Sequence, residues 1–284
     1  MSWFDLAHGR WLDPPGGCGP RAFQLLRSAD VRLETMQIED VAWLMSLPAL
    51  ECLQVHRLEI REKASWSPKL LSSNVQDITF EVCEMHCKDI IGLMSTCKAL
   101  KDISLTSMTL YIDGQSDWFS FKQALDLHEL HLKSLAIVGI NADPDEDIVP
   151  QLSQGYFSQY SRLENLVIST ELLFGPGHTI ITQRLPTKSL RTLRVMGTWN
   201  SEEHGLKWLE ELCLFNKSNS GRLESVHVSW DIIDFTKHEE WKRLQRTCAS
   251  YGVDLEIWEF RKMDEELSEE AYLKYAKKDP SRTR

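Results

Sequence analysis

The stretch Leu50-Glu-Cys-Leu53-Gln-Val55-His-Arg-Leu58-Glu-Ile60 decides the fold, because its pattern of apolar and variable residues returns along the chain. Clear copies of its first half lie at Val75–Phe80, Leu100–Leu105, Leu132–Ile137, Leu163–Ile168, Leu190–Val195 and Leu223–Val228. Weaker copies lie at Val31–Leu33 and Leu255–Ile257. A phrase that recurs with the same internal spacing indicates a repeat architecture rather than a set of unrelated strands.

The second apolar residue of each copy marks the period of the repeat. These markers are Val31, Leu53, Ile78, Ile103, Leu135, Leu166, Leu193, Val226 and Leu255. Their spacing lies mostly in or just above the roughly 20–29 residues of a leucine-rich repeat. Each short strand turns one face inward, and the long return to the next strand suits parallel pairing through a helix rather than a hairpin. The sequence therefore predicts an α/β leucine-rich-repeat solenoid, with a curved parallel sheet and helical returns on the convex side.

The repeats also set the expected domain organisation. Residues 1–28 should form an N-terminal cap or tail, residues 29–260 a solenoid of about nine units, and the charged residues 261–284 a C-terminal tail. Helical returns are expected over residues 39–47, 88–98 and 201–215, and around Leu70–Leu71. A capping box at Thr236-Lys-His-Glu239 should begin the last helix, and Gly252 should end it in a left-handed conformation.

Composition narrows the classes of function. The formal net charge of −10 argues against a surface for nucleic acid. Seven cysteines at irregular spacings favour a reducing compartment. The N-terminus lacks a secretory pattern, and no stretch approaches the roughly 18 apolar residues of a membrane span. We therefore expect a cytoplasmic or nuclear protein that binds neither nucleic acid nor membrane.

The phrases resemble leucine-rich repeats of the irregular, ribonuclease-inhibitor-like kind. The closing section, Leu223-Glu-Ser-Val-His-Val228 with Trp241-Lys-Arg-Leu244 and Cys248-Ala-Ser-Tyr-Gly-Val-Asp-Leu-Glu-Ile257, is similar to the end of fungal F-box-type leucine-rich-repeat proteins. The resemblance implies a substrate receptor of a cullin-type ubiquitin ligase, in which an F-box binds the adaptor and the repeats hold the substrate. No Leu-Pro-x-Glu helix cluster of the F-box kind is visible in residues 1–30. The alternative is a structural or regulatory repeat protein unrelated to ubiquitination.

If the markers point inward, the alternate residues of each strand form the concave face of the sheet. This face should be acidic in its N-terminal half and more apolar towards the C-terminus, so we expect it to bind a protein partner. The candidate residues are Gln54, His56, Thr79, Glu81, Asp102, Ser104, Val138, Val167, Arg194, Met196, His227 and Trp258. The alternative is a solvated sheet face that binds nothing.

Two other groupings suggest chemistry only superficially. Cys83, His86 and Cys87, with Cys97 further on, could suggest zinc, but a second matching pair of ligands is missing and Cys97 fits an apolar helix face. His227 lies between two serines, with no carboxylate expected to orient it and no oxyanion hole. We therefore expect no metal, no cofactor and no catalytic activity.

Overall fold

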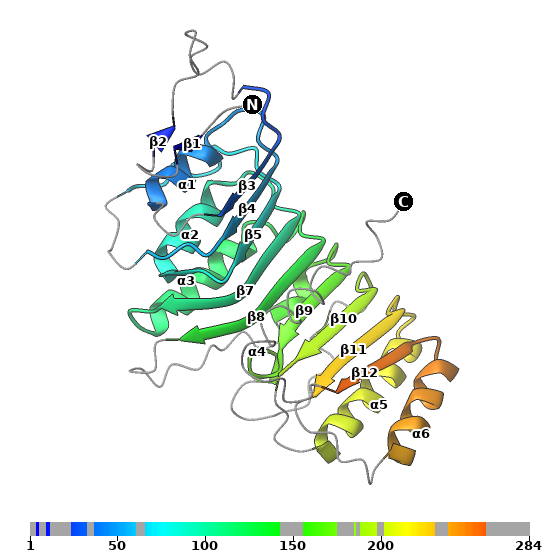
Figure 1. Cartoon of the computed structure of the whole chain (residues 1–284). Coiled ribbons are helices and arrows are strands. Elements are labelled where there is room, and N and C mark those ends of the chain that lie inside the picture. Colours follow the sequence, from blue (N-terminus) through cyan, green and yellow to red (C-terminus); the bar gives the residue numbers. More distant parts are fainter. Residues whose placement is uncertain are drawn as a thin grey trace.

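The computed structural model describes residues 4–5, 10–11, 24–32, 37–60, 66–142, 156–174, 185, 188–197, 202–230 and 238–259. They form an α/β fold around one open sheet of ten parallel strands (Figure 1). The strands are β3 (Ser28–Arg32), β4 (Cys52–His56), β5 (Asp77–Glu81), β6 (Glu84–His86), β7 (Asp102–Tyr111), β8 (Ser134–Ala142), β9 (Asn165–Ser169), β10 (Thr192–Met196), β11 (Ser225–Trp230) and β12 (Asp254–Glu259). They lie side by side in chain order, except that β5 and β6 both pair with β7. Strands β1 (Phe4–Asp5) and β2 (Arg10–Trp11) form a separate antiparallel pair.

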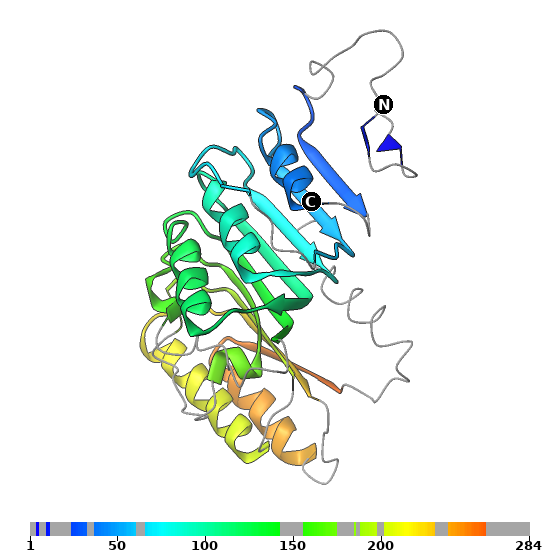
Figure 2. The ribbon, with the colours of Figure 1, turned by 90° about the vertical axis from the view of Figure 1, so that its left-hand side faces the viewer.

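The helices lie on one face of the sheet, as Figure 2 shows. They are α1 (Ile38–Met45), α2 (Cys87–Thr96), α3 (Gln115–Asp126), α4 (Thr170–Phe174), α5 (Glu202–Ser218) and α6 (His238–Ser250), with a 3₁₀ turn at Tyr156–Gln159. Neighbouring helices pack in pairs, α2 on α3 and α5 on α6. Within the described part of the chain, none of these helices combines the length and hydropathy needed to cross a membrane.

The core is the layer between the sheet and the helices, and the repeat markers lie at its centre. In-register pairing aligns Leu53, Ile78, Ile103, Leu135, Leu166, Leu193, Val226 and Leu255 across neighbouring strands. Each of these side chains is at most 4% exposed. The predicted register of these eight strands is therefore confirmed.

The first marker was wrong by two residues. Ala29, not Val31, pairs with Leu53, and Val31 pairs with Val55 instead. A shift of two residues leaves the alternation of a strand unchanged, so the apolar pattern alone could not distinguish the two registers.

A column of left-handed residues crosses the N-terminal half of the sheet. It consists of Arg57 (φ 57°), Val82 (φ 56°), Ser107 (φ 52°) and Gly139 (φ 62°), each directly after the fifth aligned residue of its strand segment. This stacked bulge shifts the alternation by one residue. The segments after the bulge therefore turn a second set of apolar residues, including Leu58 and Ile60, into the core.

Most of the expected helical returns are present, as α1, α2 and α5, but the helix around Leu70–Leu71 is not. Residues 66–74 form turns and extended chain, and Leu70 and Leu71 are 65% and 49% exposed. The indole of Trp66 lies over Gly92 of α2, where an added Cβ would come within 2.9 Å of it, and its Nε1 donates to Asp89 (3.3 Å). This docking holds the return against α2 in a non-helical path.

The described part of the last return has the predicted helix and the predicted left-handed glycine. Trp241, Leu244 and Cys248 of α6 are buried, and Gly252 has a left-handed φ of 80°. The predicted capping residue Thr236 lies outside the described residues, as do residues 261–284.

Buried polar side chains tie the returns to the following strands. The backbone N–H of Leu100 donates to Nδ1 of His128 (3.3 Å), and Nε2 of His128 lies 3.1 Å from the carbonyl oxygen of Met94. These contacts fix the neutral ring with its proton on Nε2. Asn216 makes an equivalent pair of bonds, to the backbone N–H and carbonyl of Leu223 (both 3.2 Å). A single side chain thus satisfies two buried backbone groups in each case.

Candidate binding surface on the open sheet face

The face of the sheet opposite the helices is called the open face below. Its side chains come from the first, third and fifth aligned positions of each strand, which alternate with the buried markers. Side chains at the first and third positions are half-buried on β4, β5, β7, β8, β9, β10 and β11. Neighbouring strands lie about 4.8 Å apart, so these positions form continuous rows across the sheet.

The fifth position is different, because its side chains are buried from β4 to β9. This row consists of His56, Glu81, Thr106, Val138 and Ser169. On the first four of these strands, the left-handed bulge follows directly after it. The open face therefore contains a buried row of side chains that runs from β4 to β9.

The candidate residues divide between these environments. His56, Glu81 and Val138 lie in the buried row. The half-buried candidates are Gln54, Thr79, Asp102, Ser104, Val167, Arg194, Met196 and His227. Trp258 pairs with Ser229 in the sheet, and its side chain lies outside the described part of the structure.

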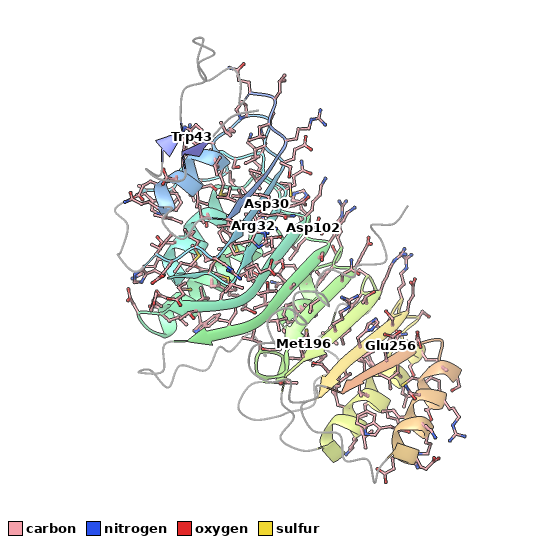
Figure 3. All side chains as sticks on the ribbon, in the orientation of Figure 1. Asp30, Arg32, Trp43, Asp102, Met196 and Glu256 are labelled. Atoms are coloured by element: carbon pink, nitrogen blue, oxygen red, sulfur yellow. The ribbon has the colours of Figure 1, made fainter. Side chains whose placement is uncertain are left out.

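A cluster of ionisable side chains lies at the N-terminal end of the open face. Nδ1 of His56 lies 2.7 Å from Oε2 of Glu81, and Nε2 of His56 lies 3.5 Å from Oδ1 of Asp30. Arg32 Nε also lies 3.5 Å from Oδ1 of Asp30. Figure 3 labels Asp30 and Arg32, which both lie on β3. The Glu81 carboxylate is therefore engaged inside the protein.

Two further acidic side chains lie two rows from Glu81 on the open face. Asp77 and Asp102 occupy the same aligned position on β5 and β7, and both are half-buried. Asp77 was not among the candidates, although its place directly before the marker Ile78 puts it on the open face. Two carboxylates side by side give this end of the face a local negative potential.

A second cluster lies on the C-terminal strands. Arg194, His227 and Glu256 are aligned across β10, β11 and β12, and Nδ1 of His227 lies 2.9 Å from Oε2 of Glu256. Burial lowers the pKa of His227, the positive charge of Arg194 lowers it further, and Glu256 opposes both. The expectation that no carboxylate orients His227 was wrong, because Glu256 reaches it from the next strand.

This histidine is nevertheless not joined to a serine by any hydrogen bond that the structure shows. The hydroxyl of Ser225 donates to Thr192 Oγ1 (3.4 Å) on the neighbouring strand. The bond links two strands of the sheet and leaves the histidine with its carboxylate partner. In the described part of the chain, the arrangement presents an oriented polar surface.

The cysteines that suggested zinc lie in the core. Cys83 and Cys87 are both buried, and burial raises the pKa of Cys83 to about 11 and that of Cys87 to about 12. Burial therefore disfavours the thiolate form, which is the form that zinc binds, at both positions. Across the described ranges, no three His, Cys, Asp or Glu side chains gather in a group that could hold a metal ion.

Comparison with known protein families finds no family model that matches this chain, and comparison with curated proteins finds no matching relative.

Proposed function

We propose that this chain is a leucine-rich-repeat solenoid that acts as a non-catalytic scaffold and binds a protein partner on its open face. The main support is the continuity of that face: rows of half-buried side chains run from β4 to β11, and the described helices all lie on the opposite side (Figure 2). Stacked repeats commonly use such extended surfaces for protein binding. Parallel sheets without this role are normally covered on both faces.

The chemistry of the face suggests the character of the partner. Asp77 and Asp102 favour a basic segment at the N-terminal end, while Val167 and Met196 offer apolar contacts further along. Small side chains between them, such as Ser134 and Ala136, allow a partner to approach the sheet closely. Charge complementarity of this kind mainly sets orientation and association rate, and the apolar contacts supply affinity.

The more specific proposal, a substrate receptor of a cullin-type ubiquitin ligase, rests on the sequence resemblance of the closing section alone. A regulatory repeat protein with no link to ubiquitin uses the same surface. The two proposals differ in the proteins that should accompany the partner.

Affinity purification of the full-length protein from its own cells, followed by mass spectrometry, tests the proposed binding surface and distinguishes the two proposed roles. The open-face variant carries Thr79→Arg and Ser104→Arg, which place long cations on adjacent half-buried sites without touching the core. The control carries Ser120→Arg and Thr247→Arg, which make the same changes at half-buried positions of α3 and α6, away from the open face.

We expect the open-face variant to lose a partner that the control retains. Recovery of the same proteins with both variants would contradict the proposed surface. A cullin and its adaptor among the retained proteins would support the ligase receptor, and a reproducible partner without them would support the regulatory scaffold.

A further inference from the structure

The last two long helices carry a pair of cysteines whose sulfur atoms face each other. Cys213 of α5 and Cys248 of α6 have Sγ atoms 2.8 Å apart, although they are 35 positions apart in the chain. Both are free thiols, and both are fully buried.

The other buried cysteines have different surroundings. The Sγ atoms of Cys83 and Cys97 lie against backbone carbonyl oxygens, 3.6 Å from Val55 and from Leu93 respectively. Cys87 lies 4.0 Å from the carbonyl oxygen of Asp117. A disulfide has an S–S bond of about 2.0 Å, so Cys213 and Cys248 need to close by less than about 1 Å to form one.

We propose that Cys213 and Cys248 form a reversible disulfide when the protein meets a hydroperoxide such as hydrogen peroxide. The thiolate of Cys248 attacks one peroxide oxygen, the O–O bond breaks, and the departing hydroxide takes up a proton to become water. Cys248 is then a sulfenic acid. The sulfur of Cys213 attacks the sulfur of Cys248 and loses its proton, while the S–O bond breaks and the hydroxide leaves as a second water. Two thiols and one peroxide thus give one disulfide and two water molecules.

A hydrogen bond between the two thiols favours the thiolate form of the acceptor. The S–H of Cys213 donates to Sγ of Cys248, which lowers the pKa of Cys248 and raises that of Cys213. The two steps balance equally with the roles of the cysteines exchanged, and either order gives the same disulfide between Cys213 and Cys248.

The place of the pair in the fold explains how an oxidant reaches a buried site. Strand β12, which follows α6, is the edge strand of the sheet, so α6 belongs to the terminal described unit. End units of a repeat stack open more readily than central ones, because they have a neighbour on one side only. The disulfide would link α6 to α5. It would therefore join the last described unit, which contains β12 and Glu256, to the unit before it.

The test is peptide mapping of the full-length protein after treatment with hydrogen peroxide. Trypsin cuts after Lys207, Lys217 and Arg246, so the two cysteines lie on separate peptides, residues 208–217 and 247–261. We expect these peptides to be joined after oxidation and separated by a reductant. The melting temperature should rise by about 5 °C on oxidation and return on reduction.

Two variants test whether the effects of peroxide come from Cys213 and Cys248 or from oxidation of thiols in general. Cys213→Ser should abolish both the joined peptides and the rise in melting temperature, whereas Cys52→Ser, at a half-buried site on the open face, should retain both. Mapping of the unmodified protein decides the question even if a variant folds poorly. Separate peptides after oxidation, or a link from either residue to another cysteine, would overturn the proposal.

Discussion

Replacing His128 with leucine should destabilise the protein by about 2–6 kcal/mol. The ring is fully buried and satisfies two backbone groups, the N–H of Leu100 and the carbonyl oxygen of Met94. Leucine keeps much of the volume but can bond neither group, and each buried group left unsatisfied costs about 1–3 kcal/mol. His128 follows α3, and its two hydrogen bonds connect this segment to Met94 of α2 and to Leu100, just before β7. The substitution removes both connections.

Urea denaturation measures this loss as a fall in the midpoint at constant slope. His131→Leu is the matched control, because His131 lies three residues further on and its side chain is exposed. It should change the free energy of unfolding by no more than about 0.5 kcal/mol. If the two variants were equally stable, the proposed role of His128 in fixing the return would be wrong.

The same substitution should also change how stability depends on pH. Burial lowers the pKa of His128 from its ordinary value of 6.5, so the folded protein favours the neutral ring. The resulting stabilisation is complete above about pH 6.5 and is lost as the pH falls below it, because the unfolded chain then binds a proton that the folded chain resists. The loss is at most about 1.4 kcal/mol per pH unit for one proton. The difference in unfolding free energy between wild type and His128→Leu should therefore shrink from pH 7.5 to pH 5.5, and a constant difference would contradict this reasoning.

Two further substitutions test the open face and the bulge. Glu81→Lys should destabilise the protein by about 3–5 kcal/mol in urea denaturation, because it replaces the buried carboxylate that pairs with His56 by a buried cation; a loss below about 0.5 kcal/mol would mean that the pair is exposed in solution. Gly139→Val should cost at least about 1–2 kcal/mol, since Gly139 has a φ of 62° and its added Cβ would lie 3.4 Å from the backbone of Ser107. Ala136→Val adds a similar side chain to an open-face position of the same strand and should be nearly neutral; equal effects of the two would contradict the left-handed bulge.

The sheet could be predicted from sequence because its signal is local and repeated. Each copy of the Leu53-x-Val55 pattern specifies one inward face, and the long return to the next copy favours parallel neighbours. Errors arose where a distant contact decided the outcome. The return at Leu70–Leu71 has apolar residues that suit a helix, but the docking of Trp66 on Gly92 fixes another path. The slip from Ala29 to Val31 preserves alternation, so only pairing with β4 reveals it.

The candidate surface was predicted in outline and not in detail. Alternation correctly separates the open face from the core, but it cannot show that the row containing His56, Glu81 and Val138 is buried. That row lies beside a bulge whose positive φ values depend on stacked strands rather than on residue type, since Val82 is an unfavourable residue for such a conformation. The contact between His227 and Glu256 likewise depends on the register of β11 and β12.

Side-chain footprinting with hydroxyl radicals tests the central proposal most directly, by comparing the isolated protein with the complex recovered from cells. Met196 is half-buried on the open face, and Trp43 is 41% exposed on α1, away from that face (Figure 3). We expect the partner to protect Met196 from oxidation and to leave Trp43 unchanged. Protection of Trp43 with unchanged oxidation of Met196 would show that the partner binds elsewhere, and the open face would lose its proposed role.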